Sequence, residues 1–378
     1  GMKYIKTDGL HLIDLVLKAK EAEKECRLNR KPVFLHMKTV RLIGHAGSDI
    51  EVGYRELKDI ENDEFDDPLL HSARILIENN CISKEEVLSL YKQKRLQVER
   101  VFNTAISKPK LKTATNVMSA ILANKHPRKV PKIPSDLIRK KVFGKEFSRL
   151  KYSQHMGKLI NYSLTDILLQ YSNTVVFGED VAQKGGVYHV TADLYSQFGA
   201  RRVFNSPLDE TSIIGFGLGL GHNGFVPIPE IQFLAYFHNA EDQLRGEAAT
   251  LPFFSEGRFT NPMVLRIPGL AYQKGFGGHF HNDNSLTIFR DIPGIIIAVP
   301  SNGADAVKML RTSVKEAYEN GRVVIFIEPI ALYMTKDLYD EKDGKWTFQY
   351  PNPKEEIVLG DFQVYGSGNS LTIITYGN

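Results

Sequence analysis

A candidate for acid–base chemistry is Glu210, near the middle of the chain. It follows residues 205–209, of sequence Asn-Ser-Pro-Leu-Asp, where a short strand is expected to lead into a helix. Open α/β sheets bind ligands at the carboxyl ends of their strands, so Glu210 is placed for proton exchange with a ligand. A glutamate in the first turn also stabilises a helix through the helix dipole, and that structural role is the alternative.

Tyr236 and His281 are two further candidates in the same half of the chain. Tyr236 follows the run Glu-Ile-Gln-Phe at 230–233, and its ring could stack on a planar ligand, although spacing alone favours the core. His281 ends the run Gly-Gly-His-Phe-His at 277–281, expected as an extended segment with both imidazoles on one side. A metal would need a third ligand at a familiar spacing, which is lacking. A glycine-flanked histidine in a loop suits proton transfer better, with a plain surface histidine as the alternative.

A third candidate group lies near the start of the chain, in the glycine-containing loop predicted for 41–55. Arg41, His45 and Asp49 follow one another closely there. A guanidinium, an imidazole and a glycine-rich bend could bind a phosphate group. An ordinary polar loop is the alternative.

Alternating glycines at 215–221 superficially suggest a dinucleotide-binding loop. That fingerprint has GxGxxG spacing directly after a strand, whereas the glycines here alternate as GxGxGxG. The helix is expected to begin earlier, at Asp209-Glu210. We therefore reject the dinucleotide interpretation and expect this helix to pack closely against another helix.

The residues from Lys151 onward alternate between apolar strand patterns and helical patterns. A helix is expected over 157–171, ahead of the first strand. The six expected strands are 174–177, 203–204, 226–228, 263–266, 295–299 and 323–327. This alternation predicts a doubly wound, mostly parallel α/β sheet. After Pro329 we expect a polar hairpin-like stretch, and then the opening strands of a further domain over 360–377.

The first part of the chain is predicted to be mainly helical. Apolar residues at helical spacing indicate a helix over 9–27, and residues 32–37 are expected to form a short buried strand. Asp67-Pro68 is typical of a helix start, with an N-cap and a first-turn proline. Ser83 and Glu86 predict a capping box for another helix.

Charge is distributed unevenly along the chain. The 378 residues carry a net charge of +4, yet residues 107–150 contain 12 Lys and Arg against two acidic residues. Prolines and the lack of a long periodic pattern indicate a linker, with a short helix near 114–123. A nucleic-acid arm usually interleaves aromatic residues with its basic ones, so a solvated linker that docks on acidic neighbours is favoured.

Composition limits the class of protein. Hydrophobic residues make up 42% of the chain, enough for a sizeable core. No apolar run reaches the roughly 18 residues of a membrane helix. Two cysteines form neither a disulfide framework nor a thiol zinc site, and the N-terminus has no signal or transit pattern. We therefore expect a cytoplasmic protein that does not associate with membranes.

Around the candidate residues described above, the chain resembles the thiamin-diphosphate-dependent first component of 2-oxo acid dehydrogenase complexes. Residues 8–68 resemble the end of that family's α subunit, and residues from 178 onward resemble the pyrimidine-binding domain of its β subunit. The shared β-subunit blocks are 178–181, 185–188, 202–210, 230–233, 278–281, 293–294, 300–301 and 326–333. The resemblance covers nearly the whole chain outside the basic segment. It implies that this segment is the linker of a fused α–β chain.

The resemblance implies a role for each candidate residue. Glu210 matches the catalytic glutamate that hydrogen-bonds N1′ of the aminopyrimidine and promotes its imino tautomer. Tyr236 matches the aromatic residue that stacks on the pyrimidine, and His281 the β-subunit histidine near the reacting carbon. His45 matches the α-subunit histidine of the phosphate-side loop, and Arg41 the arginine on the diphosphate side. The cofactor supplies the organic chemistry, and the protein supplies position and proton management.

The implied reaction is oxidative decarboxylation of a 2-oxo acid, with acyl transfer to the lipoyl group of a partner acyltransferase. The blocks at 205–208, 230–233 and 326–333 favour a branched-chain substrate, with pyruvate as the alternative. The family's cofactor sites lie between subunits, so a homo-oligomer is expected. Nucleic acid is not an expected partner.

One departure from the family affects these expectations. The Gly-Asp-Gly…Asn motif that holds Mg²⁺ and the diphosphate is absent, which implies that Mg²⁺ is held by a domain missing from this chain. We predict the C-terminal part of an α-like domain at 1–106, a basic linker at 107–150, the pyrimidine-binding domain at 151–335 and the start of a C-terminal domain at 336–378. Such a piece is expected to bind thiamin diphosphate weakly, if at all, and to be inactive alone. A non-catalytic assembly module is the competing hypothesis.

Overall fold

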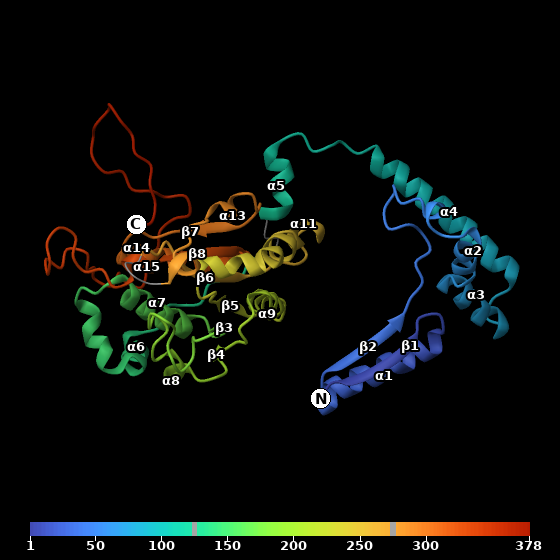
Figure 1. The fold of residues 1–378 in the computed structure, drawn as a ribbon, viewed down its shortest axis with the longest axis horizontal. Helices are drawn as coiled ribbons and strands as arrows, with labels where there is room; N and C mark the ends of the chain where they lie inside the picture. Colours follow the sequence, from blue (N-terminus) through green and yellow to red (C-terminus); the bar gives the residue numbers. More distant parts are fainter. Residues whose placement is uncertain (123–126, 273–276) are drawn as a thin grey trace. The chain divides into compact units, whose positions relative to one another are not determined.

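The computed structural model describes residues 1–122, 127–272 and 277–378. The chain divides into two compact units, Gly1–Lys110 and Leu111–Asn378. The elements of each unit can be followed by their labels in Figure 1. Within the described ranges, no helix is long and apolar enough to span a membrane.

The first unit combines a two-stranded parallel sheet with helices. Its elements are β1 (Lys3–Asp8), α1 (Leu12–Asn29), β2 (Val33–Lys38), the 3₁₀ turn η1 (Glu51–Gly53), α2 (Leu57–Phe65), α3 (Pro68–Glu78) and α4 (Lys84–Ile106). The predicted helix starts are confirmed. Asp67 accepts a hydrogen bond from the backbone N–H of Leu69, and Ser83 and Glu86 form the capping box.

The strand expected at 32–37 exists but is not buried. It is β2, which pairs in parallel with β1, a strand that the sequence patterns did not predict. Ile5 of β1 is buried, whereas Phe34 of β2 is half exposed and His36, two residues further on, is exposed as well. Because α1 covers only one face of this narrow sheet, alternate side chains remain in contact with solvent.

The second unit contains all six predicted strands and most of the helices. Its helical elements are α5 (Ala114–Leu122), α6 (Asp136–Phe143), η2 (Gly144–Lys151), α7 (Met156–Gln170), α8 (Leu194–Phe198), α9 (Glu210–His222), α10 (Leu234–Phe237), η3 (His238–Ala240), η4 (Gln243–Ala248), α11 (Leu251–Phe254), α12 (Gly278–His281), α13 (Thr287–Arg290), α14 (Gly303–Asn320) and α15 (Ile330–Tyr333). Its strands are β3 (Thr174–Gly178), β4 (Val203–Asn205), β5 (Val226–Pro229), β6 (Met263–Gly269), β7 (Ile296–Ala298) and β8 (Val323–Pro329).

These strands form the predicted parallel, doubly wound sheet. Two ladders, β4-β3-β5 and β6-β8-β7, are joined by a parallel bridge between Glu230 and Arg266, and Figure 1 shows the six strands following one another across the unit. Val176 packs into the core with α7 and α14, while its neighbour Phe177 packs into the opposite core with α9. Successive strand residues therefore bury both faces of the sheet, as parallel sheets require.

Part of the basic segment docks on an acidic neighbour, as expected, but this part is buried and not solvated. Arg139 of α6 is buried and forms two hydrogen bonds with the Asp166 carboxylate, at 2.8 and 3.0 Å. Phe143 is also buried, with its ring centroid 5.8 Å from that of Tyr162. A carboxylate on α7 thus fixes this part of the segment to the second unit. The helix expected near 114–123 is α5, although Ala123 lies outside the described residues.

The strands expected over 360–377 are absent from the structure described here. Residues 351–378 contain no helix or strand, and Phe362 and Ile374 are largely exposed. A strand needs a neighbouring strand to complete its backbone hydrogen bonds. In this unit the segment has no such partner, so its apolar pattern alone does not produce a sheet.

Candidate active site

Glu210 is the first residue of α9, at the carboxyl edge of the sheet. Asp209 caps the helix by accepting from the backbone N–H of Ser212 at 3.3 Å. The Glu210 side chain is nearly buried, 5% exposed, and its Oε2 accepts from the Asn239 amide at 3.4 Å. A buried carboxylate with one long hydrogen bond retains capacity to bond a ligand.

The glycines of α9 pack against a strand rather than a helix, which corrects the expectation. A side chain at Gly217 would meet the Met263 sulfur of β6 at 3.0 Å, and one at Gly221 would meet Pro262 at 3.2 Å. Gly215 has open space around it. The small residues therefore let α9 lie close to the sheet, and so hold Glu210 at its edge.

A second carboxylate, Glu179, lies beside Glu210 and was missed by the sequence reasoning. It directly follows β3, and its Oε1 is buried without a hydrogen-bond partner among the described residues. Burial raises the pKa of Glu179 to about 7, and the carboxylates of Glu210, Asp180 and Glu230 add to the rise. Its position directly after an expected strand is the sequence feature that could have identified Glu179 as a candidate site residue.

Phe233, Tyr236 and His281 form an aromatic group. The His281 ring meets the edge of Phe233 with centroids 4.5 Å apart, and its Nε2 is 3.3 Å from the Tyr236 hydroxyl. The Nδ1 of His281 is 2.7 Å from the carbonyl of Gly277. Since a carbonyl only accepts, Nδ1 carries the proton in neutral His281, and Nε2 can accept from Tyr236.

The structure corrects the local conformation expected for His281. Residues 278–281 form the short helix α12 instead of an extended segment. Its glycine-rich start allows this turn, because Gly277 adopts φ +79°. On a helical turn, residues two apart point in different directions, so His279 and His281 do not face one side together.

Buried charges link three neighbouring strands of the sheet. Arg266 of β6 is fully buried, 2.6 Å from Glu328 of β8 and 2.9 Å from Glu230 beyond β5. The Tyr333 hydroxyl also bonds Glu328. Burial raises the pKa of Glu230, and the Arg266 guanidinium opposes that rise. The network fixes the strand ends from which the site residues project.

Arg41 and His45 belong to the first unit, whereas the Glu210 group belongs to the second. Both are exposed in the loop before η1. The backbone N–H of His45 donates to Asp49 at 2.7 Å, and the Tyr54 hydroxyl donates to the same carboxylate at 3.1 Å. Asp49 therefore shapes this loop, while the side chains of Arg41 and His45 remain available to solvent.

The second-unit group fits a polar, planar ligand. Glu179 Oε1 and Ser206 Oγ are buried polar atoms without a hydrogen-bond partner in the described chain, and they follow β3 and β4. The partly exposed ring of Tyr236 offers a stacking surface, with the buried Phe233 ring packed against it. Across the described residues, no group of three or more His, Cys, Asp or Glu side chains could hold a metal ion.

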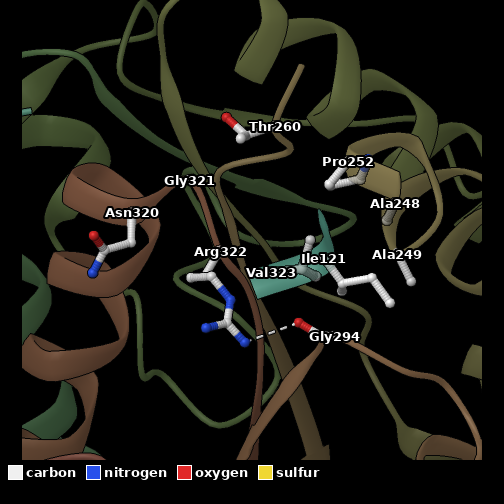
Figure 2. Close-up of a pocket in the computed structure, with 10 residues that line it drawn as sticks. All are labelled: Ile121, Ala248, Ala249, Pro252, Thr260, Gly294, Asn320, Gly321, Arg322 and Val323. Carbon is white, nitrogen blue, oxygen red and sulfur yellow. Dashed lines mark hydrogen bonds between the residues drawn. The ribbon is translucent and has the colours of Figure 1, made fainter. Parts of the chain in front are cut away.

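A small cavity elsewhere in this unit is not a candidate site. Figure 2 shows it between Ile121 of α5, Ala249 and Gly294. Its volume is about 20 Å³, which is room for a water molecule and little more. It marks where α5 packs on the unit.

Comparisons with known proteins match two separate parts of the chain to two family models. Residues 153–335 match the transketolase pyrimidine binding domain, and residues 1–114 match the dehydrogenase E1 component. The chain is 35% identical to the pyruvate dehydrogenase E1 component subunit beta of Bacillus subtilis over 59% of this chain and 63% of the relative. It is 36% identical to the 2-oxoisovalerate dehydrogenase subunit beta of Pseudomonas aeruginosa, over 57% and 62%.

A similar match is found to the 3-methyl-2-oxobutanoate dehydrogenase subunit beta of Mycobacterium tuberculosis, 34% identical over 61% of this chain and 62% of the relative. The chain thus spans less than two thirds of the length of these three relatives. All three are subunits of 2-oxo acid dehydrogenases, which are enzymes. Residues 153–335 therefore have the fold of a transketolase-like pyrimidine-binding domain, and residues 1–114 are similar to the dehydrogenase E1 component.

Proposed function

We propose that this chain provides the aminopyrimidine side of a thiamin-diphosphate site in a 2-oxo acid dehydrogenase first component. The observation that carries the proposal is the buried Glu210 carboxylate at the carboxyl edge of a pyrimidine-binding domain, beside unpartnered polar atoms and an aromatic surface. Thiamin diphosphate, when bound, would supply the carbanion chemistry that cleaves a 2-oxo acid.

Glu210 would hold a proton at the pyrimidine ring. Its near-complete burial removes competing water. Among the described residues it accepts a hydrogen bond from the Asn239 amide, which leaves lone pairs for N1′. Tyr236 would provide the stacking surface. His281 would face the reacting centre, with its Nε2 able to accept or return a proton.

Arg41 and His45 would serve the diphosphate side of a site. Both are exposed in the first unit, and both carry groups that bind phosphate oxygens well. Mg²⁺ would be held by residues outside this chain, which explains the proposed weak affinity of the chain alone. The same proposal includes a fused α–β origin and a cytoplasmic location. It also includes the domain limits 1–106, 107–150, 151–335 and 336–378.

The proposed reaction is oxidative decarboxylation with acyl transfer to the lipoyl group of a partner acyltransferase, in a homo-oligomer. A branched-chain 2-oxo acid is the proposed substrate. It is supported by the blocks at 205–208, 230–233 and 326–333. Pyruvate is the alternative, since relatives of comparable identity carry either substrate in their names.

The test is decarboxylation by the native protein that carries this chain, with 2-oxoisovalerate and with pyruvate. Glu210→Gln is expected to lower turnover by a factor of about 100 or more, whereas the exposed Glu247→Gln should leave it unchanged. A Glu210→Gln variant with full activity would show that the assigned role is wrong. Faster turnover of pyruvate would reject the branched-chain assignment alone.

Calorimetry separates the catalytic proposal from a non-catalytic assembly module. The chain alone is titrated with thiamin diphosphate and Mg²⁺, and weak or undetectable heat is expected. Tight binding would contradict the claim that the diphosphate-binding residues lie elsewhere. Native protein that neither binds the cofactor nor decarboxylates either acid would support the assembly module instead.

A further inference from the structure

Two side-chain contacts join the segment after Phe233 to the segment that carries His281. The first is the Tyr236 hydroxyl to His281 Nε2, at 3.3 Å. The second is His238 Nε2 to Asp283 Oδ2, at 3.1 Å. Each segment contributes residues two positions apart, so the contacts form successive rungs between the same two stretches of backbone.

Asp283 is held rigidly enough to anchor its rung. Its Oδ1 accepts from the backbone N–H of Ser285 at 2.9 Å and also from the Ser285 hydroxyl. Its other oxygen is thereby aimed at His238, and its side chain is only 16% exposed. Burial would raise the pKa of Asp283, but the hydrogen bonds from Ser285 and His238 outweigh it and hold that pKa below its ordinary value.

His238 is also tied to the Glu210 side of the site through its neighbour. Asn239 follows it in η3, donates its amide to Glu210 and accepts at its carbonyl from the Thr211 hydroxyl at 3.0 Å. The short helix η3 therefore has two hydrogen bonds to the start of α9 and one to the segment after α12. A displacement of His238 would therefore affect both the start of α9 and the segment after α12.

We propose that His238 and Asp283 are positioning residues that hold His281 against Phe233 and Tyr236. Neither is proposed to touch substrate or cofactor. The α12 turn is only four residues long, too short to be stable on its own, so the placement of His281 depends on contacts beyond the turn. The His238–Asp283 contact supplies one, two residues beyond His281. The catalytic meaning of this placement rests on the function proposed above.

The test uses nuclear magnetic resonance of the full chain with labelled histidine, in which His281 is assigned from a His281→Asn variant. The readouts are the nuclear Overhauser effect between the His281 and Phe233 rings, and the imidazole tautomer of His281. Wild-type chain should show the effect and a single Nδ1–H tautomer. His238→Ala and Asp283→Ala should each lose the ring-to-ring effect at least severalfold and mix the tautomers.

Two controls make the result specific. His238→Gln places an amide donor at a similar reach from the backbone and should restore the wild-type pattern. Asp291→Ala removes a carboxylate from an exposed ion pair with Arg290 and should change neither readout. Because His238 is 47% exposed at its side chain, its substitution should leave the fold intact even if Asp283→Ala does not.

Three results would overturn the inference. One is an unchanged ring-to-ring effect in both alanine variants. Another is a loss in His238→Gln as large as in His238→Ala, which would attribute the effect to ring packing and not to the hydrogen bond. The third is an equal loss in Asp291→Ala. These readouts involve no cofactor, so failure of the decarboxylation assay would refute the proposed function while leaving this contact established.

Discussion

Arg266 and Glu328 form a bidentate ion pair inside the sheet, with Nε–Oε1 and Nη2–Oε2 distances of 2.6 and 2.8 Å and both side chains fully buried. The third nitrogen, Nη1, lies 2.9 Å from Glu230 without the alignment of a hydrogen bond. One buried cation on β6 therefore lies between two carboxylates from its neighbours on either side, Glu230 after β5 and Glu328 near the end of β8. Each charged group in the network is stabilised by a partner of opposite charge. Loss of the cation leaves buried carboxylates with uncompensated charge.

Arg266→Leu should therefore lower the free energy of unfolding by about 3–5 kcal/mol, since it leaves Glu328 and Glu230 buried without a cation. Urea denaturation at neutral pH measures this loss. Arg290→Leu removes one partner of an exposed pair and should leave the free energy of unfolding almost unchanged. Similar losses in the two variants would mean that the buried network does not stabilise the sheet as described.

Glu179 predicts a pH dependence of stability. Its pKa is about 7 in the folded chain against an ordinary value of 4.5, so between these values the folded state binds more protons than the unfolded state. Stability should therefore fall as pH rises from about 4.5 to about 7 and stay lower above that. Glu179→Gln should remove this fall and gain about 1–2 kcal/mol at pH 8, after allowance for partial exposure.

Urea titrations of wild type and Glu179→Gln at pH 5 and pH 8 check this sign. The two proteins should differ little at pH 5 and clearly at pH 8. Glu247→Gln, at an exposed position, serves as the matched control. A variant that is less stable than wild type at pH 8 would show that ionised Glu179 has a stabilising partner.

Gly294 should tolerate no side chain while α5 is docked. Its φ is +87°, and a Cβ there would lie 2.1 Å from the Ile121 side chain, which Figure 2 shows beside it. Gly294→Ala combines backbone strain with this clash and should cost about 1–3 kcal/mol. Ile121→Ala in the same chain should recover the part due to the clash. No recovery in the double variant would mean that strain alone is responsible.

Limited proteolysis should separate the exposed part of the basic segment from its packed part. Lys110 and Lys112 are exposed and lie outside regular structure, whereas Arg139 is buried in its pair with Asp166. Trypsin should therefore cut first after Lys110 or Lys112, and mass spectrometry should find a fragment that begins at Leu111 or Thr113. Early cleavage after Arg139 would contradict its packing on the second unit.

Much of the fold of the second unit follows from local patterns. The strands at β3 and β8 are short apolar runs between helical patterns, and Glu210 was placed correctly because Asp209 is a strong N-cap after a strand. The parallel order is the usual outcome of such alternation. These features depend on residues close together in the chain.

The remaining features depend on contacts that local patterns do not contain. Arg139 appeared to belong to a solvated linker because its partner, Asp166, is 27 residues away. The proximity of Glu179 to Glu210 follows from the pairing of β3 with β4, not from their spacing. His281 was expected on an extended segment. The turn of α12 depends on Gly277 at positive φ, a backbone conformation that the local residue pattern does not reveal.

The claim that Glu210 manages a proton at the cofactor is tested most directly by the exchange of the thiamin C2 hydrogen with D₂O. The exchange is followed by proton magnetic resonance in the native protein loaded with thiamin diphosphate and Mg²⁺, without substrate. Glu210→Gln should slow it by a factor of about 100 or more, and the exposed Glu247→Gln should not. Exchange at the wild-type rate in Glu210→Gln would contradict the account.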